Sequence, residues 1–198
     1  MIRRGETWGQ DTVMPVAVVE ASSDALLARA PSSLPVFVSA GDIARSIGNP
    51  SRPSPGATCT EVAIDAMQCT IHRTGSAELI THAASSVVIG QLWRGRHIIV
   101  SNAGWVRDSN VAPRAHPNDG IVEMMTLSEH MSLRQRFLAS RKMRTGTHIP
   151  HPDIVNSRET QFQITKNGTE RLVIDGVRVH DWTQVAITVL PDYWRVLL

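Results

Sequence analysis

The amino-acid sequence predicts an α+β fold, in which a short α/β unit precedes an antiparallel β-sandwich that carries one inserted helix. Short apolar runs alternate with short capped helical segments over residues 1–50. Residues 50–58 are rich in proline, glycine and small polar residues, which is typical of a loop between two parts of a chain. The remainder consists mainly of strand patterns separated by turn signals. We therefore expect two domains, residues 1–50 and 51–198.

The first domain is expected to contain two buried strands, each followed by a short helix. Residues 14–19 and 35–39 are almost wholly apolar, which favours strands that are buried on both faces. Residues 25–30 and 42–47 are typical of short helices, and a glycine closes the second one. Three residues before the first helix can cap its N-terminus, namely Ser22, Ser23 and Asp24.

The second domain is expected to be mostly strand. Apolar or alternating runs predict strands over residues 61–70, 84–90, 97–102, 121–127, 160–166, 171–174 and 185–190. Asn167 and Gly168 form a strong hairpin signal, so we expect the strands on either side of this pair to pair with each other.

One helix interrupts these strands over residues 129–143. Ser128 can cap it and Gly146 can end it. We expect its apolar side chains to face a core, namely Met131, Leu133, Phe137 and Leu138. Basic side chains gather on the same segment: Arg134, Arg136, Arg141, Lys142 and Arg144. They can contact anionic lipid headgroups or form the solvated face of a packed helix.

Charge and composition argue against several classes of protein. The formal net charge of +2 gives no reason to expect a nucleic-acid partner. The longest apolar run near the start, residues 13–19, is interrupted by Pro15, so we expect neither a secretion signal nor a membrane-spanning segment. Cys59 and Cys69 fit no metal or redox spacing, which favours reduced thiols in a cytoplasmic protein. The 8 histidines form no carboxylate–histidine zinc motif, so no metal site is expected.

Several short motifs occur in a fixed order along the chain. They are residues 100–123, which include Ala112-Pro113 and Asp119-Gly120; residues 146–152, which begin Gly146-Thr147-His148; and residues 173–191, which include Asp175-Gly176 and end at Pro191. Together they resemble the C-terminal part of the diacylglycerol/sphingosine-type lipid kinases of the NAD kinase-like superfamily. Residues 18–26 and 40–48 lie where that family has its nucleotide motifs, GGDGT and GTxNDfArxLG.

The resemblance implies that residues 1–50 are a vestigial, degenerate nucleotide-binding unit. The family's glycines and threonine are replaced in the phosphate-binding loop, namely by Ser22, Ser23, Ala25 and Leu26. These side chains would occupy space that a bound phosphate needs. Asp24 and Asp42 remain as candidate cofactor-binding residues, with helix capping as the alternative role of Asp24, whereas Gly41 replaces the family's asparagine. The family's first βα units are missing, which implies an N-terminally truncated member.

The same resemblance implies a candidate catalytic pair in the second domain. Asp119 matches the family's aspartate that helps to deprotonate the lipid hydroxyl, a role for which a carboxylate is suited. Glu123 can add a second acid, because it lies two residues beyond Ile121 on the same strand face. The alternative is that Asp119-Gly120 is only a tight turn that opens a strand. Four basic residues of the helix are candidate headgroup contacts: Arg134, Arg141, Lys142 and Arg144.

The combined prediction is a diacylglycerol kinase-like protein that is catalytically impaired as a lone chain and acts as a lipid-binding or regulatory module. The alternatives are an active ATP-dependent lipid kinase, which phosphorylates a lipid hydroxyl, and a purely structural assembly module. No cofactor is expected unless the kinase alternative holds, and that alternative requires Mg²⁺ and ATP. The expected partners are a lipid or membrane surface and a second copy or partner subunit at exposed strand edges. We expect a cytoplasmic protein, with peripheral membrane contact as an open alternative.

Overall fold

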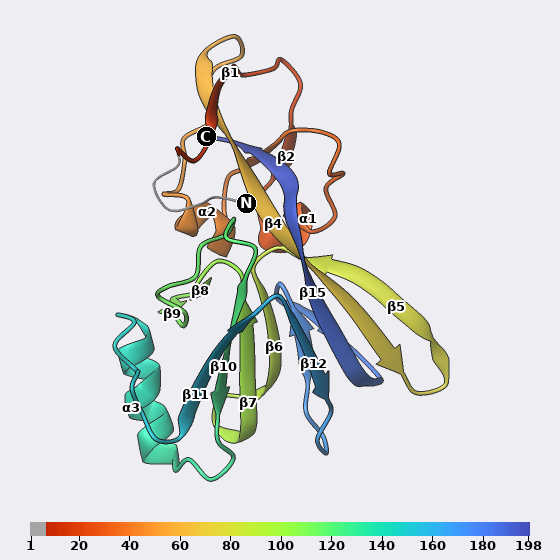
Figure 1. Cartoon of the computed structure of the whole chain (residues 1–198), viewed down its shortest axis with the longest axis vertical. Coiled ribbons are helices and arrows are strands. Elements are labelled where there is room, and N and C mark those ends of the chain that lie inside the picture. The colour runs from red at the N-terminus through yellow and green to blue at the C-terminus, as the bar shows by residue number, and fades with distance from the viewer. Residues whose placement is uncertain (1–6) are drawn as a thin grey trace.

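Two large β-sheets form the framework of the chain, whose computed structural model describes residues 7–198 (Figure 1). Sheet A has seven strands: β1 (Gln10–Val13), β4 (Thr58–Arg73), β15 (Trp182–Leu197), β3 (Val36–Val38) and β2 (Val19–Ala21) in this order, with β5 (Ser76–Ala83) beside β4 and β12 (Gln161–Thr165) beside β15. Sheet B has six, in the order β11 (Ile154–Glu159), β10 (Val122–Leu127), β7 (Arg94–Ser101), β6 (Ser86–Gln91), β13 (Leu172–Ile174) and β14 (Val177–Val179). A small hairpin joins β8 (Trp105–Val106) to β9 (Ser109–Asn110). The predicted α+β class, with a β-sandwich and an inserted helix, is confirmed.

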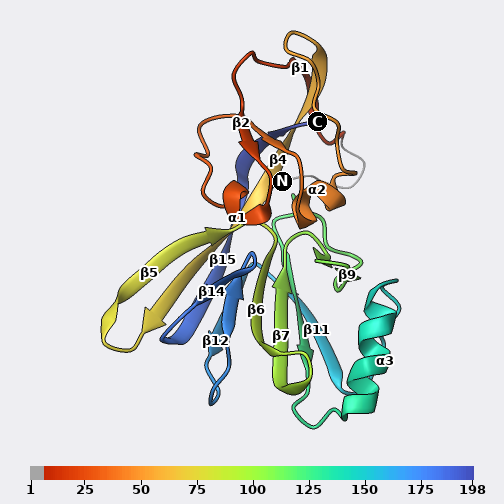
Figure 2. The same ribbon diagram turned by 180° about the vertical axis from the view of Figure 1, so that it is seen from behind.

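The strands β4 and β15, of 16 residues each, run through both the upper and the lower part of the molecule (Figures 1 and 2). They pair antiparallel, and their register shifts between Leu190 and Trp194. Below this shift they form one layer of the sandwich with β5 and β12, and above it they join β1, β3 and β2. Val196 of β15 pairs in parallel with Val36 of β3, so the last strand completes the sheet of the first unit. Because both parts share β4 and β15, the division of the chain at residue 50 stays a prediction.

The lower part is a β-sandwich whose core lies between sheets A and B. Alternate side chains of each strand face this core, as the pleat of a strand requires. Met67, Cys69 and Ile71 of β4 share one buried cluster with Val87 and Ile89 of β6. Burial of an aliphatic side chain of this size stabilises the fold by about 1.5–3 kcal/mol, so this cluster holds the two sheets together.

The upper part packs two short helices, α1 (Asp24–Leu27) and α2 (Asp42–Ser46), against sheet A. Leu27 of α1 and Ile43 of α2 are fully buried in one cluster with Trp194 of β15. The indole Nε1 of Trp194 donates a hydrogen bond of 3.2 Å to the carbonyl oxygen of Ala30. Residues from both ends of the chain therefore build this core.

The outer face of sheet B is covered by α3 (Leu133–Met143), which lies away from the sandwich core (Figures 1 and 2). The side chains of Ser132 and Gln135 form its capping box, so the predicted cap at Ser128 is wrong by one turn. The prediction that its apolar residues face a core holds for Met131, which is buried, and is wrong for the other three, which are largely exposed: Leu133, Phe137 and Leu138. The helix instead buries Arg136, Ala139 and Met143. Among residues 7–198, no helix is long and apolar enough to cross a bilayer.

Arg136 explains this orientation of α3. Its Nε donates to the carbonyl oxygen of Met131 at 2.9 Å, and its Nη1 donates to that of Leu92 at 2.8 Å. Its Nη2 donates to the carbonyl oxygens of Gly95 at 2.5 Å and Ser128 at 2.6 Å. A buried cation is tolerated only where its donors are satisfied, and the guanidinium reaches these carbonyls only when α3 turns Arg136 towards the β6–β7 turn.

Two predicted strand arrangements are wrong. The strand expected over residues 14–19 is absent, because the chain forms β1 before Met14 and β2 from Val19 onwards. Pro15 has no N–H for a ladder hydrogen bond, which favours this break. The expected hairpin around Asn167-Gly168 does not form either, since β12 pairs with β15 in sheet A and β13 pairs with β6 and β14 in sheet B. The turn therefore carries the chain from one sheet to the other.

Candidate functional site

A large cavity, of about 730 Å³, lies on the outer face of sheet B below the junction with the upper part. We call it the main cavity. Sheet B supplies its apolar floor through Val88, Ile99 and Val173, while Val111 and Met143 add apolar side chains from the loop after β9 and from the end of α3. Carboxylates line one end of it, namely those of Asp24, Asp42 and Asp175. The main cavity is therefore amphipathic.

Asp24 holds the N-terminus of α2. Its Oδ2 accepts a hydrogen bond of 2.7 Å from the N–H of Asp42, and its Oδ1 accepts one of 3.0 Å from the N–H of Ile43. The N-cap residue Gly41 has no side chain for this purpose, so a carboxylate from α1 caps α2 instead. Burial raises the pKa of Asp24, although its hydrogen bonds to these backbone N–H groups oppose that rise.

Asp42 connects α2 to the β8–β9 hairpin. Its Oδ2 accepts a hydrogen bond of 2.9 Å from the N–H of Arg107. Arg45, one turn further along α2, donates to the carbonyl oxygen of Arg107 and stacks its guanidinium 4.9 Å from the ring centre of Trp105. Burial is the main cause that raises the pKa of Asp42. These contacts fix the hairpin over the carboxylate end of the main cavity.

Asp175 accepts more backbone hydrogen bonds than either of the other two carboxylates. It accepts hydrogen bonds from three successive backbone N–H groups, those of Ala84 at 2.6 Å, Ser85 at 3.0 Å and Ser86 at 2.8 Å. Burial raises the pKa of Asp175 to about 6 in spite of these bonds. The sequence analysis found Asp175 in a family motif but did not predict it as a site residue. The only feature that could have indicated a site was the Asp-Gly pair directly after a strand.

The predicted phosphate-binding loop has an ordinary helix-capping geometry. Ser23 has φ −164° and its hydroxyl oxygen accepts a hydrogen bond of 3.3 Å from the N–H of Leu26. None of residues 21–26 has a positive φ. A nest of N–H groups around a phosphate needs the left-handed conformations that glycine provides, so this loop lacks the cradle that its position in the sequence suggested.

Asp119 and Glu123 lie together, but apart from the main cavity. Arg158 of β11 contacts both, with its Nη2 2.9 Å from Oδ2 of Asp119 and its Nε 3.0 Å from Oε1 of Glu123. Burial is the largest cause that raises the pKa of each carboxyl, and the charge of Arg158 opposes it. The structure therefore unites the predicted catalytic pair, while Asp24 and Asp42 lie elsewhere. The catalytic role of the pair stays a prediction.

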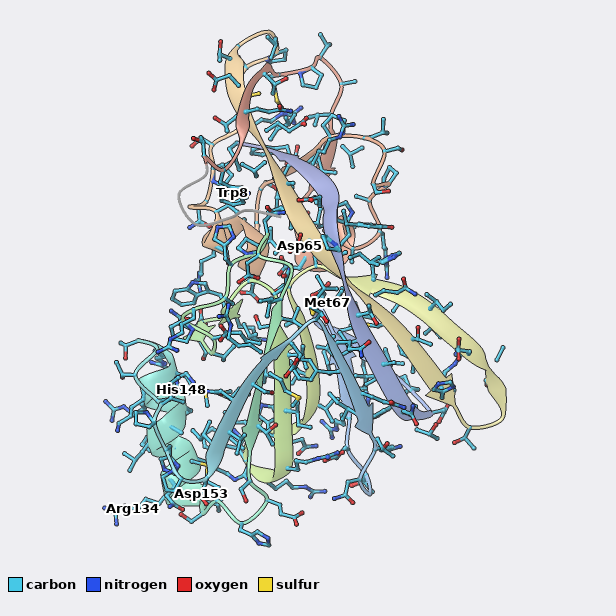
Figure 3. All side chains as sticks on the ribbon, in the orientation of Figure 1. Trp8, Asp65, Met67, Arg134, His148 and Asp153 are labelled. Carbon is cyan, nitrogen blue, oxygen red and sulfur yellow. The ribbon has the colours of Figure 1, made fainter. Side chains whose placement is uncertain are left out.

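Asp65, which sequence reasoning missed, holds the loop that carries Asp119. It is fully buried in the middle of β4, where the two long strands pass between the parts of the molecule (Figure 3). Its carboxylate accepts hydrogen bonds from the N–H of Gly120 at 2.7 Å, from Nδ2 of Asn118 at 3.1 Å and from the N–H of Asp192 at 2.8 Å. One buried carboxylate thus fixes both this loop and the irregular point of β15.

The four predicted headgroup residues are exposed on α3 and just after it: Arg134, Arg141, Lys142 and Arg144. Figure 3 shows Arg134 at the outer side of this helix, away from the sheets. The helix contains no acidic residue. Within residues 7–198, no group of three or more His, Cys, Asp or Glu side chains is placed to hold a metal ion.

Comparisons with known proteins place this geometry in a family. The family model described as the YegS C-terminal NAD kinase beta sandwich-like domain matches residues 61–198. A crystal structure described as a "putative diacylglycerol kinase from Bacillus anthracis str. Sterne" is similar at 10% identity and a TM-score of 0.62, over 90% of this chain and 76% of that chain. A second diacylglycerol kinase structure from the same organism is similar at 11% identity and a TM-score of 0.53, over 90% and 74%.

A search of curated protein sequences found no match. The similarity to the two solved structures, at these identities, shows a kinase-like fold and nothing finer. The family match and the shared fold confirm the resemblance to the NAD kinase-like lipid kinases that the motifs indicated. The chain therefore belongs to the family of YegS C-terminal NAD kinase beta sandwich-like domains.

Proposed function

We propose that this protein is a lipid-binding module with a diacylglycerol kinase-like fold, and that the lipid lies in the main cavity. The amphipathic lining of that cavity carries the proposal. A hydroxyl-bearing head can donate hydrogen bonds to carboxylate oxygens at the end formed by Asp24, Asp42 and Asp175. An acyl chain can lie along the apolar floor. The volume of about 730 Å³ is in the usual range for small-molecule sites.

The contacts of the carboxylates support binding without phosphoryl transfer. Both oxygens of Asp24 accept hydrogen bonds from α2, and the carboxylate of Asp175 accepts three from its neighbouring strand and turn. The loop over residues 21–26 has no left-handed residue to cradle a phosphate. The residues present therefore fit ATP poorly, and we propose that the lone chain is catalytically impaired.

One observation favours the kinase alternative. Asp24 and Asp42 come from the first unit and Asp175 from the second, so carboxylates from both parts meet at one end of the main cavity. An active kinase requires Mg²⁺ and ATP there. Calorimetric titration with Mg-ATP separates the two functions, because saturable binding at millimolar nucleotide would support the kinase and its absence would support the binding module.

We further propose that α3 brings the protein to an anionic membrane surface. Its exposed side combines apolar residues with cations: Leu133, Phe137 and Leu138 with Arg134, Arg141, Lys142 and Arg144. This combination is typical of interfacial helices, and each basic residue near an anionic surface contributes about 1 kcal/mol. Met143 links the helix to the main cavity. Pelleting with anionic and zwitterionic vesicles tests this contact, with Arg134→Glu/Arg141→Glu as the variant.

Self-association remains a further proposal. The edge strands of sheet B, β11 and β14, have no neighbouring strand on their outer sides in the described sheets. Such edges can pair with another chain. Light scattering coupled to size exclusion tests this proposal, and a monomer over a wide range of protein concentration would contradict it.

The lipid site is tested by filling the main cavity. Val173→Trp places a large side chain on the cavity floor, whereas Val155→Trp makes the same change at an exposed valine of β11 outside it. A fluorescent diacylglycerol is expected to bind the unmodified chain and Val155→Trp alike, and to bind Val173→Trp at least about tenfold more weakly. Equal binding to all three proteins would contradict a lipid site in the main cavity.

A further inference from the structure

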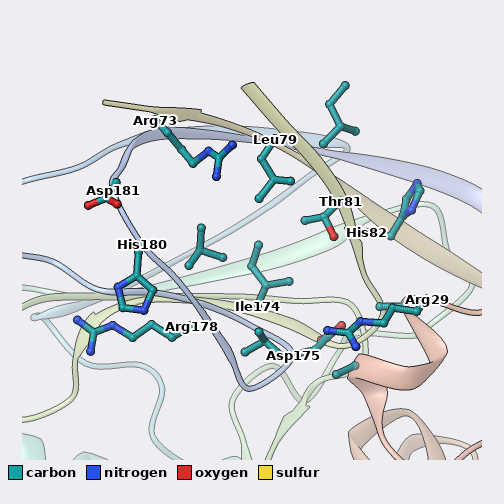
Figure 4. Close-up of a pocket in the computed structure, with 15 residues that line it drawn as sticks. Arg29, Arg73, Leu79, Thr81, His82, Ile174, Asp175, Arg178, His180 and Asp181 are labelled. Atoms are coloured by element: carbon teal, nitrogen blue, oxygen red, sulfur yellow. The ribbon is translucent and has the colours of Figure 1, made fainter. Parts of the chain in front are cut away.

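A second cavity, of about 420 Å³, opens at the edge of the sandwich between β5 and the β13–β14 hairpin (Figure 4). We call it the basic cavity. Its cationic lining comes from the turn after α1, both sheets and their turns: Arg29, Arg73, His82, Arg178 and His180. Leu79, Ile174 and Val179 form apolar walls beneath them. Five side chains that carry or can carry positive charge thus surround a partly apolar space.

Little negative charge within the protein balances these cations. The guanidinium groups of Arg29 and Arg178 make no hydrogen bond or ion pair with any residue in the described range 7–198. Arg73 donates from Nε and Nη2 to one carbonyl oxygen, that of Ala77, at 3.2 and 2.9 Å. The cavity also has two carboxylates in its lining, Asp181 at the exposed rim and Asp175 at the inner end.

The carboxylate of Asp175 already accepts hydrogen bonds from backbone N–H groups of the protein. Its oxygens accept the hydrogen bonds from Ala84, Ser85 and Ser86, so it does not pair with Arg29 or Arg178. The remaining carboxylate of Asp181 can offset one cation, which leaves an excess of positive charge in the cavity. Guanidinium groups that line one hollow from separate elements and form no ion pair are suited to an anionic ligand.

We propose that the basic cavity binds a phosphate monoester whose organic part lies on the apolar walls. A guanidinium presents parallel N–H donors that match two phosphate oxygens, and Arg29, Arg73 and Arg178 can approach such a group from three elements. The cavity is far larger than one phosphate group, so the rest of the ligand occupies the space over Leu79, Ile174 and Val179. This site lies beyond the main cavity and does not depend on lipid binding there.

The source of the phosphate can be a lipid headgroup or a small soluble phosphate. Two probes distinguish them in calorimetric titrations: inorganic phosphate, and decyl phosphate below its micelle concentration. Comparable affinity for the two probes assigns a soluble phosphate. Affinity for decyl phosphate that is higher by about tenfold or more assigns a lipid phosphate, since a buried chain adds about 0.8 kcal/mol per CH₂ group. Higher affinity for decyl phosphate supports the whole proposal, whereas comparable affinity supports the phosphate site and contradicts an organic part on the apolar walls.

Matched variants test whether the phosphate probes bind in the basic cavity. Arg29→Gln and Arg178→Gln remove a charged donor at exposed positions, and each is expected to weaken decyl phosphate binding by about tenfold. Arg94→Gln makes the same change at an exposed position of β7 that does not line the cavity, and it should leave the affinity unchanged. Decyl phosphocholine, which lacks the dianionic monoester, should bind more weakly than decyl phosphate.

His82 gives an independent readout. Its ring contacts that of Tyr193 at 4.7 Å between centres, and burial lowers the pKa of this imidazole. The charged groups that line the cavity with it are Arg29, Arg73, Arg178, His180, Asp175 and Asp181. A bound phosphate should raise the pKa of His82 in an NMR titration.

Three results would overturn the proposal: no binding of either phosphate probe at millimolar concentration, equal losses for Arg94→Gln and Arg178→Gln, or an unchanged His82 pKa with decyl phosphate bound. Val173→Trp, which fills the main cavity, should leave phosphate binding unaltered. Failure of the basic cavity and failure of the proposed lipid site are therefore separate results.

Discussion

A Cβ atom on Gly41 would lie 2.6 Å from Oδ1 of Asp24, closer than real Cβ atoms approach an oxygen. Asp24 comes this near because its carboxylate caps α2 from a helix 18 residues earlier in the chain. Gly41 also has φ 112°, which L side chains rarely adopt. The glycine is thus explained by the packing of Asp24 against α2, with no nucleotide required.

Gly41→Ala should destabilise the protein by about 3 kcal/mol, because it combines backbone strain with the approach to Asp24. Gly48→Ala is the matched control, since Gly48 has φ 93° but no atom within 4 Å of its added Cβ. Gly48→Ala should lower the free energy of unfolding by only about 1 kcal/mol, which is the part due to backbone strain. Urea unfolding measures both values. Equal losses would show that the contact between Gly41 and Asp24 is unimportant.

Arg136→Met should lower the free energy of unfolding by about 3 kcal/mol, because four buried or part-buried carbonyl oxygens lose their donor. Arg134→Met is the control on the exposed side of the same helix and should change stability by no more than about 0.5 kcal/mol. Chemical unfolding followed by circular dichroism compares the two. If both variants are equally stable, Arg136 does not determine the orientation of α3.

When the pH falls, the unmodified protein should gain free energy of unfolding relative to the Asp175→Asn variant. The pKa of Asp175 is about 6 in the folded chain, above the ordinary value of 3.8, so the folded state binds more protons between these pH values. The stability that this carboxyl contributes is complete below pH 3.8 and is lost as the pH rises through about 6. Relative to Asp175→Asn, the free energy of unfolding should fall by up to about 3 kcal/mol as the pH rises from 3.8 to above 6. Parallel pH profiles for the two proteins would contradict the raised pKa.

Arg158→Gln should raise the pKa of both Asp119 and Glu123, because the guanidinium charge opposes the effect of burial on each carboxyl. Carbon-detected NMR titration measures these values. The half-exposed ion pairs should contribute no more than about 1 kcal/mol to stability. Arg52→Gln, which removes an ion pair with Glu20, should leave the two pKa values unchanged. Unchanged values in Arg158→Gln would show that the pairs do not persist in solution.

The sequence predicted the strands of the sandwich well, because alternation along one strand is a local pattern. The segment over residues 61–70 and that over 185–190 lie within β4 and β15, and the helices over residues 25–30 and 42–47 overlap α1 and α2. Local patterns could not show that β4 and β15 continue into the upper sheet. That continuation depends on partners such as Val36 and Val196, which are 160 positions apart in the chain.

The same limit applies to the site. Asp24 and Asp42 were found because they fall in motif positions, and they do lie at one end of the main cavity. Asp65 and Asp175 were missed as site residues, since their partners are backbone N–H groups as far as 127 and 91 residues away. The orientation of α3 was wrong for a related reason: hydrophobic periodicity favoured Phe137 and Leu138 as core residues, whereas carbonyls of the β6–β7 turn select Arg136.

The proposal that the main cavity holds a lipid is tested most directly by photo-crosslinking. A diacylglycerol that carries a diazirine in its acyl chain is bound and irradiated, and the labelled residues are mapped by mass spectrometry. We expect labels on β6, β7 and β13 at the cavity floor, at Val88, Ile99 and Val173. Labels confined to other surfaces, or a chain that remains unlabelled at saturating lipid, would contradict a lipid site in the main cavity.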